Sequence, residues 1–97
     1  MRVIAISTLK EFWDKHPDSE LPLKEWYVKV SRANWSSLSD IKKDFNSVDY
    51  VGNQHYVFNI KGNHYRLVAA IKYIPKLVYI RFIGTHDEYG KIDVSTI

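Results

Sequence analysis

The sequence predicts an α+β fold in which two or three N-terminal helices pack on one face of a small antiparallel β-sheet. Two observations lead to this fold class. Apolar residues recur at helical spacing in the first part of the chain, and they alternate with polar residues after Asn46. With 97 residues, of which 45% are hydrophobic, the chain can build one core, so residues 1–97 are expected to form a single domain.

The N-terminal segment is expected to form a strand followed by a helix. "MRVIAI" is short and rich in β-branched residues, as strands are. A helix is predicted over "TLKEFWDKH", with Ser7 as its N-cap, and "PDSE" ends it. The apolar stripe of this helix consists of Leu9, Phe12, Trp13 and His16.

Two further helices are predicted before the sheet. One begins near Asp18 or Ser19 and continues through "LPLKEWYVKVSRAN", and a shorter one covers "SSLSDIKKDF". The residues on the apolar side of the longer helix are Leu23, Trp26, Tyr27 and Val30. Those of the shorter helix are Leu38, Ile41 and Phe45.

Three strands are predicted next, over "HYVFNI", "HYRLVAAIKY" and "KLVYIRFI". Gly62-Asn63 suits a two-residue type II′ turn, in which the glycine takes a positive φ angle. Pro75 marks the second turn. Short connections of this kind join antiparallel neighbours, so the three strands are expected to form a meander.

The alternation assigns side chains to the two faces of this sheet. If Lys61 pairs with His64 across the turn, residues opposite each other share a face. A turn of two or four residues at "YIPK" then keeps Arg81 out of the core, whereas a three-residue turn would bury it unpaired. The apolar face, which the helices should cover, is predicted to hold Tyr56, Phe58, Ile60, Tyr65, Leu67, Ala69, Ile80 and Phe82.

The opposite face is predicted to be open to solvent and basic. It should hold His55, Val57, Asn59, Lys61, His64, Arg66, Val68 and Arg81, and continue into Thr85 and His86. A single arginine or histidine on such a face is usually only solvated, and His16 and His55 taken alone are interpreted as packing or surface residues. Two guanidiniums, a lysine and imidazoles together, without close acidic partners, indicate a phosphate site.

Such a face fits the cleavage of RNA without a metal. Attack by a 2′-hydroxyl on the adjacent phosphorus needs a base, an acid, and cations for the phosphate oxygens. Histidine can serve as acid or base, and arginine binds phosphate bidentately. The net charge of +3 favours a polyanionic partner. The sequence has no paired carboxylates for glycoside cleavage, no phosphate-binding glycine loop and no metal-ligand spacing, so we expect no metal and no cofactor.

Two stretches, "YVFNIKGNHYRLVAAIKY" and "VYIRFIGTHDEY", resemble the HigB group of RelE-like toxins of bacterial type II toxin–antitoxin systems. The resemblance covers essentially the whole chain and implies the RelE-like α+β fold and cleavage of mRNA on translating ribosomes. It implies catalytic roles for Arg66, Arg81, His86 and Tyr89. Relatives commonly have aspartate after the tyrosine, where this chain has Gly90.

The predicted substrate-binding residues are His55, Asn59, Lys61 and His64. The general base remains open among His64, Lys61 and Tyr89, and ribosomal RNA is a further alternative. The resemblance also implies a HigA-like antitoxin with a helix-turn-helix domain, together with mRNA and the ribosome, as partners. With no cysteine and no long apolar segment, we expect a cytoplasmic protein that does not enter a membrane. The rival interpretation is a module that binds RNA or an acidic protein segment and cleaves nothing.

Overall fold

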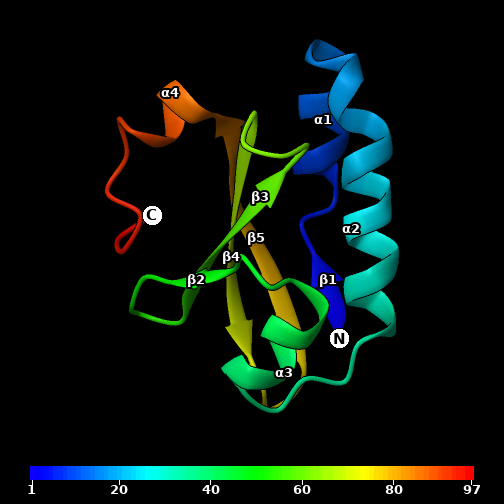
Figure 1. The fold of residues 1–97 in the computed structure, drawn as a ribbon, viewed down its shortest axis with the longest axis vertical. Helices are drawn as coiled ribbons and strands as arrows, with labels where there is room; N and C mark the ends of the chain where they lie inside the picture. The colour runs from blue at the N-terminus through cyan, green and yellow to red at the C-terminus, as the bar shows by residue number, and fades with distance from the viewer.

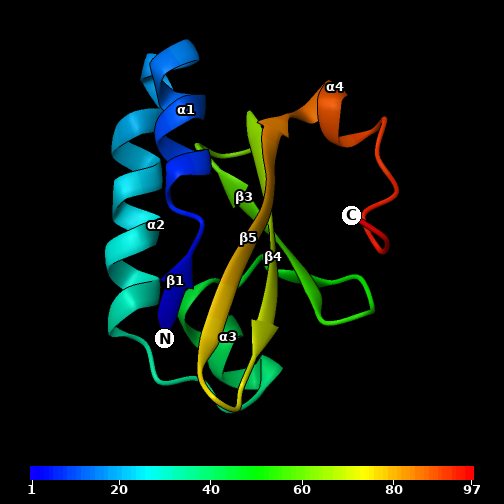
Figure 2. The ribbon, with the colours of Figure 1, turned by 180° about the vertical axis from the view of Figure 1, so that it is seen from behind.

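Two helices and one turn of 3₁₀ helix lie on one side of a five-stranded sheet, and the C-terminal segment lies on the other side (Figures 1 and 2). The computed structural model describes residues 1–97. The elements in chain order are β1 (Arg2–Ile4), α1 (Ser7–Lys15), η1 (Pro17–Ser19), α2 (Glu20–Arg32), α3 (Leu38–Asp44), β2 (Asp49–Tyr50), β3 (His55–Ile60), β4 (Tyr65–Lys72), β5 (Leu77–Thr85) and α4 (His86–Tyr89).

The sheet is mixed, with strand order β1-β5-β4-β3-β2. The predicted antiparallel meander of β3, β4 and β5 is confirmed, as is the α+β class. The pairing of β1 was not predicted: it adds to the free edge of β5 in parallel orientation, so the whole sheet is mixed. Sequence reasoning also missed β2, which is two residues long and too short to show a period.

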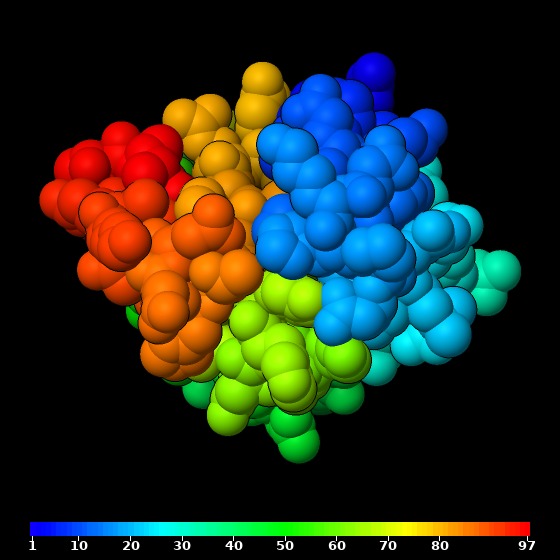
Figure 3. Space-filling model, turned by 90° about the horizontal axis from the view of Figure 1, so that it is seen from above, coloured from blue at the N-terminus to red at the C-terminus, as the bar shows by residue number.

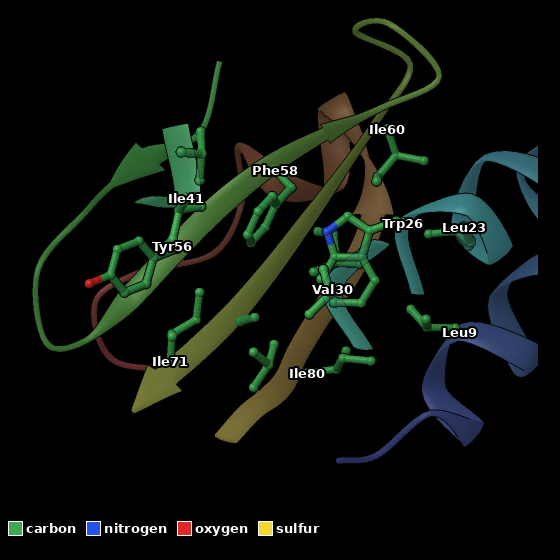
Figure 4. Close-up of a cluster of buried hydrophobic side chains, with 14 of the residues drawn as sticks. Leu9, Leu23, Trp26, Val30, Ile41, Tyr56, Phe58, Ile60, Ile71 and Ile80 are labelled. Carbon is green, nitrogen blue, oxygen red and sulfur yellow. The ribbon is translucent and has the colours of Figure 1, made fainter. Parts of the chain in front are cut away.

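The helices bury the apolar face of the sheet, as predicted. Seventeen buried residues form one core cluster, in which Phe58 of β3 is 1% exposed and contacts the helices through Trp26 of α2 (Figure 4). The two rings meet edge to face, with centroids 5.5 Å apart. The indole nitrogen of Trp26 is buried without a hydrogen-bond partner.

The N-termini of α1 and α3 are formed in different ways. Ser7 was expected to cap α1, but it is the first helical residue and makes no capping bond. The chain instead turns into the helix through Ala5, which has a φ of 72°, and the amide of Thr8 donates to the Ala5 carbonyl. Ser37 is a true N-cap, whose hydroxyl accepts from the amide of Asp40 at 3.3 Å.

The hairpin between β3 and β4 has the predicted register. Ile60 pairs with Tyr65, and Gly62 takes a φ of 64°. The connection from β4 to β5 has the four residues 73–76, one of the two lengths that keep Arg81 out of the core. It contains a cis peptide bond before Pro75.

A β-bulge at Arg81 changes the register of the last part of β5. Ala69 pairs with Ile80 but Val68 pairs with Phe82, so Arg81 is the extra residue of β5. From this point the alternation is inverted. Phe82, expected on the apolar face, therefore lies opposite Val68 on the other face, and Ile83 packs against the core instead. Thr85 likewise lies opposite Tyr65, not on the predicted open face.

The face opposite the helices is only partly open, because residues 91–97 cross it (Figure 2). The Nδ1 atom of His55 donates to the Val94 carbonyl at 2.8 Å, and the Asn53 amide donates to the Ser95 carbonyl at 2.9 Å. Val57 and Val68 on this face are buried although no helix covers them. The prediction of a solvated basic face was therefore wrong for its middle and holds only near the β3–β4 hairpin.

Candidate active site

Two segments that are far apart in sequence meet at one end of the sheet. They are the β3–β4 hairpin with the first residues of β4, and the end of β5 with α4. Figure 3 looks down on this end, where the hairpin lies beside the segment that holds α4. Arg66 pairs with Gly84, and Tyr65 pairs with Thr85. Arg66 therefore lies on the strand next to the residues that lead into α4.

Arg66 is a half-exposed arginine without an acidic partner. Its Nη1 atom donates to the carbonyls of Asn63 and Tyr65, at 3.2 and 3.5 Å. None of the three ion pairs in the molecule includes it. Two neutral carbonyls orient the guanidinium but leave its charge uncompensated and most of its donors free. Such a group can bind an anion with two parallel hydrogen bonds.

The short helix α4 is held by a capping box. The Thr85 hydroxyl accepts from the Glu88 amide at 3.2 Å, and the Glu88 carboxylate accepts from the Thr85 amide at 2.8 Å. The hydrogen bond from the Thr85 backbone is the main cause that lowers the pKa of Glu88 below its ordinary value. Glu88 is thus an ionised structural group, and the box explains why β5 ends in "THDEY".

The capping box presents His86 and Tyr89 at the end of β5. His86 is the first residue of α4 and is exposed, whereas Tyr89 is half-buried with its ring 6.5 Å from that of Phe82. Gly90, at the position where the family resemblance led us to expect aspartate, ends α4 with an ordinary φ of −65°, and its amide donates to the His86 carbonyl. The backbone therefore does not require glycine at this position.

Phe82 and Gly84 form a close contact that sequence reasoning missed. A Cβ atom on Gly84 would lie 2.4 Å from the Cζ atom of Phe82, so the ring lies directly over the glycine. Both residues follow the bulge and lie on the same face, next to Tyr89. The sequence does contain a signal for this contact: in the strand, glycine follows two positions after an aromatic residue. The aromatic ring can lie flat over that position only because glycine has no side chain.

His64 and Asn59 lie near this end, on the hairpin and on β3. The Nδ1 atom of His64 is 2.9 Å from the Lys61 carbonyl, which can only accept, so Nδ1 carries the proton. In the neutral ring Nε2 is then an unprotonated nitrogen, and the side chain is exposed. Asn59 is half-buried and its amide donates to the Ser47 hydroxyl at 3.5 Å.

Lys61 does not join these residues. Its ammonium group forms an ion pair with Asp18 of η1 at 2.7 Å, on the side of the helices. The φ angle of 51° at Lys61 breaks the strand alternation and permits this direction. Asp18 also accepts a hydrogen bond from the Tyr65 hydroxyl; the bonds from Lys61 and Tyr65 lower the pKa of Asp18, and that of Tyr65 rises to about 12. The expectation that the basic residues lack close acidic partners was wrong for Lys61.

Two other predicted site residues are bonded to the C-terminal segment, but only His55 is buried by it, whereas Arg81 is exposed. His55 is 4% exposed, so it is not on an open face, and the segment would have to move before it could touch a substrate. Arg81 donates from Nε and Nη2 to the Ile97 carbonyl at 3.3 and 3.1 Å, and its guanidinium lies 5.4 Å from the centre of the Tyr79 ring. It is three residues from Gly84, or about 10 Å along the strand.

His16 has a packing role, in line with its interpretation as a packing or surface residue. Its ring stacks on Phe12 with centroids 4.3 Å apart and lies 5.5 Å from the Tyr65 ring. No group of three or more His, Asp or Glu side chains is placed to share a metal ion. No helix of the structure combines the length and the apolar character that a membrane span requires.

The fold defines the class of the protein: a RelE-like α+β protein, in which α1, α2 and α3 lie between β1 and the other four strands and pack on one face of the sheet. Residues 19–92 match the family described as HigB toxin, RelE-like toxic component of a toxin-antitoxin system. The chain belongs to this HigB toxin family, whose description implies an antitoxin partner. The family resemblance seen in the sequence is thereby confirmed.

Two relatives from Escherichia coli are similar over nearly the whole chain. The mRNA interferase toxin HigB of strain K12 is 32% identical over an alignment of 92 positions, and the alignment covers 92% of this chain and 88% of the relative. The mRNA interferase HigB of strain O6:H1 is 27% identical over an alignment of 94 positions, and the alignment covers 95% of this chain and 91% of the relative. The similarity therefore includes the hairpin, β5 and α4, which form the candidate site.

Proposed function

We propose that this protein is an endoribonuclease that cleaves mRNA and thereby inhibits translation. The observation that carries the proposal is the placement of Arg66, an arginine without an acidic partner. It lies on the strand next to β5, beside the segment that leads into His86 and Tyr89. A site that only bound phosphate would be served by arginine and lysine alone. The names of the two relatives, both mRNA interferases, support the same activity.

In the proposed reaction a 2′-hydroxyl attacks the adjacent phosphorus, and the bond to the 5′-oxygen breaks. Arg66 stabilises the negative charge that grows on the non-bridging oxygens. His86, in its protonated form, gives its proton to the leaving 5′-oxygen. The product ends are then a 2′,3′-cyclic phosphate and a 5′-hydroxyl. In this proposal the guanidinium of Arg66 stabilises the negative charge that a metal ion stabilises in a metal-dependent nuclease. The reaction is therefore proposed to be metal-independent.

His64 is the proposed general base. Its Nδ1 atom is held by the Lys61 carbonyl, so the neutral ring offers Nε2 as an acceptor for the proton of the 2′-hydroxyl. Lys61 is the weaker candidate, because Asp18 holds its ammonium group on the other side of the sheet. Tyr89 is proposed to stack on a base of the substrate, next to the ring of Phe82. Arg81 is proposed to bind a more distant phosphate once the C-terminal segment has moved.

The partners and place of action are part of the same proposal. We propose that the mRNA is cut while it is bound to a translating ribosome in the cytoplasm, and that the antitoxin is HigA-like with a helix-turn-helix domain. The family resemblance and the net charge of +3 support an RNA partner. The rival function is binding without cleavage. Every observation that fits it is also explained by the catalytic proposal.

A substrate with one missing hydroxyl tests the proposal directly. Ribosomes are loaded with an mRNA that carries a single 2′-deoxynucleotide at the mapped cleavage position, and a matched mRNA with the ordinary ribonucleotide is the control. We expect the control to be cut to a 2′,3′-cyclic phosphate end and the deoxy substrate to bind equally well but remain intact at that position. Cleavage of the deoxy substrate at the same bond, or products with a 5′-phosphate, would contradict the mechanism. Binding of both mRNAs without any cleavage would support the rival function.

A further inference from the structure

The β-bulge in β5 turns the side chain of Phe82 out of the hydrophobic core. In a regular strand Phe82 would share the apolar face with Ile80, but Arg81 is the extra residue, so Phe82 pairs with Val68 on the opposite face. Phe82 is half-exposed and does not pack against the core cluster, whereas Ile83 does. Bulges often lie next to active sites, where they redirect a side chain. The side chain redirected here is an aromatic ring at the end of β5 that leads into α4.

The redirected ring occupies the place of a missing side chain. A Cβ atom on Gly84 would lie 2.4 Å from Cζ and 3.1 Å from Cε1 of Phe82, so no other residue leaves room for the ring in this position. Gly84 is buried, and the ring above it is half-exposed. A glycine inside a strand and an aromatic ring outside the core both cost stability, and such local rules are broken mainly at functional sites.

The position of the ring is next to the arginine of the candidate site. Arg66 pairs with Gly84, and paired side chains lie on the same face with Cβ atoms about 4.5 to 5.5 Å apart. Because the Phe82 ring fills the side-chain position of Gly84, it lies next to Arg66 on the same face of the sheet. Its aromatic neighbour is Tyr89, whose ring is 6.5 Å away and tilted by 48°. The two rings therefore do not stack on each other and present their faces in different directions.

We propose that Phe82 is a substrate-binding residue, whose ring stacks on the base of a nucleotide that flanks the scissile phosphate. The inference rests on the proposed function, in which Arg66 holds this phosphate, so the nucleotides on both sides of it lie next to the ring. Stacking on an aromatic face accepts any base, so Phe82 positions the nucleotide without selecting its identity. The tilted ring of Tyr89 then serves a different base. Covering Val68 does not explain the aromatic ring, because a leucine would cover it as well.

Substrates that lack one base test the inference on programmed ribosomes. Three mRNAs are compared: the intact one, and two that carry an abasic ribonucleotide on the 5′ or the 3′ side of the mapped cleavage position. The variants are Phe82→Leu, Gly84→Ala and the double variant. Tyr50→Leu, at a 51% exposed aromatic residue of the edge strand β2, is the matched control. Cleavage rate at limiting toxin, dissociation constant and thermal melting are measured on the same preparations.

We expect Phe82→Leu to slow cleavage of the intact mRNA by at least about fivefold, the lower end of what stacking of one base on an aromatic ring contributes. On one of the two abasic mRNAs, wild type and Phe82→Leu should be equally slow, because the stacking partner is absent. Gly84→Ala should cause a similar loss by displacing the ring, and should cause no further loss in the Phe82→Leu background. Tyr50→Leu should stay within twofold of wild type on every mRNA.

Three results would overturn the inference. They are a wild-type rate of Phe82→Leu on the intact mRNA, the same fold loss by this variant on all three mRNAs, which would show a purely structural role, and equal cleavage of all three mRNAs by wild type. If Gly84→Ala still slowed cleavage in the Phe82→Leu background, its methyl group would act on the Cβ atom of Glu88, 3.2 Å away, and the assigned reason for the glycine would be wrong. A wild-type protein that cleaves none of the mRNAs would contradict the proposed function instead, and the dissociation constants, for which the same pattern is expected, would then decide whether Phe82 stacks on a base.

Discussion

Removal of the Glu88 carboxylate should reduce activity through the position of α4 and not through the fold as a whole. The helix has four residues and none of them is buried, so packing contributes little to its stability. Its geometry depends on the two hydrogen bonds of the capping box. Glu88→Ala deletes the bond to the Thr85 amide, and the helix that presents His86 and Tyr89 is expected to unfold locally.

The size of the effect follows from that lost bond. Loss of a helix cap costs about 0.5 to 2 kcal/mol, and a loss of about 1 kcal/mol lowers the ordered fraction of a marginal helix up to about fivefold. Single-turnover cleavage by Glu88→Ala should therefore slow by about fivefold, because only the ordered fraction is active. Glu88→Gln keeps an oxygen acceptor and should lose less, and Asp87→Ala, an exposed neighbour in the same helix, should keep the wild-type rate.

The assay compares cleavage, ribosome binding and thermal melting for the three variants. The reasoning requires that the melting temperature of Glu88→Ala change little, because α4 adds no residue to the core. A wild-type cleavage rate for Glu88→Ala would refute the idea that the box positions the site. Equal losses in Glu88→Ala and Asp87→Ala would also refute it, since they would point to the charge of the segment and not to the cap.

Three further predictions concern the site and its support. If His86 is the proton donor, His86→Gln should bind ribosomes normally but slow single-turnover cleavage by about two to four decades. If His86 only binds phosphate, His86→Arg should keep much of the activity. Wild-type cleavage by His86→Gln would exclude both roles. Arg66→Ala should lose roughly 2 to 4 kcal/mol of transition-state stabilisation, or about two to three decades in rate, with an unchanged circular dichroism spectrum; a folded Arg66→Ala that remains fully toxic would remove this arginine from the site. Hydrogen bonds from Lys61 and Tyr65 lower the pKa of Asp18, so its carboxylate stabilises the fold above the unfolded pKa, and this stability is lost as the pH falls through the lower folded value. Asp18→Asn should thus be less stable than wild type at pH 7, and in urea unfolding the difference should shrink as the pH falls below the ordinary pKa of 3.8. A difference independent of pH would contradict the assignment.

The prediction for Asp18 bears on the site because this residue ties the hairpin to the helices. It bonds both Lys61 at the turn and Tyr65 at the start of β4, next to Arg66. Lys61, expected to face substrate, thus helps to hold the hairpin that carries His64. A basic residue near a phosphate site can support the site without touching the phosphate.

The sequence by itself determined the parts of the fold that depend on local patterns. Helical spacing located α1, α2 and α3, and alternation located β3, β4 and β5 with the pairing of Ile60 and Tyr65. The turn at Gly62 followed from the need for a positive φ angle. These features depend on neighbours a few residues apart, so the order of side chains is sufficient to predict them.

Only the tertiary structure decided which predicted site residues come together. The bulge at Arg81 inverted the faces of Phe82 and all later residues of β5, because one extra residue shifts the pairing with β4. Lys61 forms an ion pair with Asp18, 43 residues away in the chain. His55 is buried and donates to the Val94 carbonyl, 39 residues away. The physical reason is the same in each case: a charged or polar group is satisfied by the partner that the fold brings near it, and sequence distance carries no information about that partner.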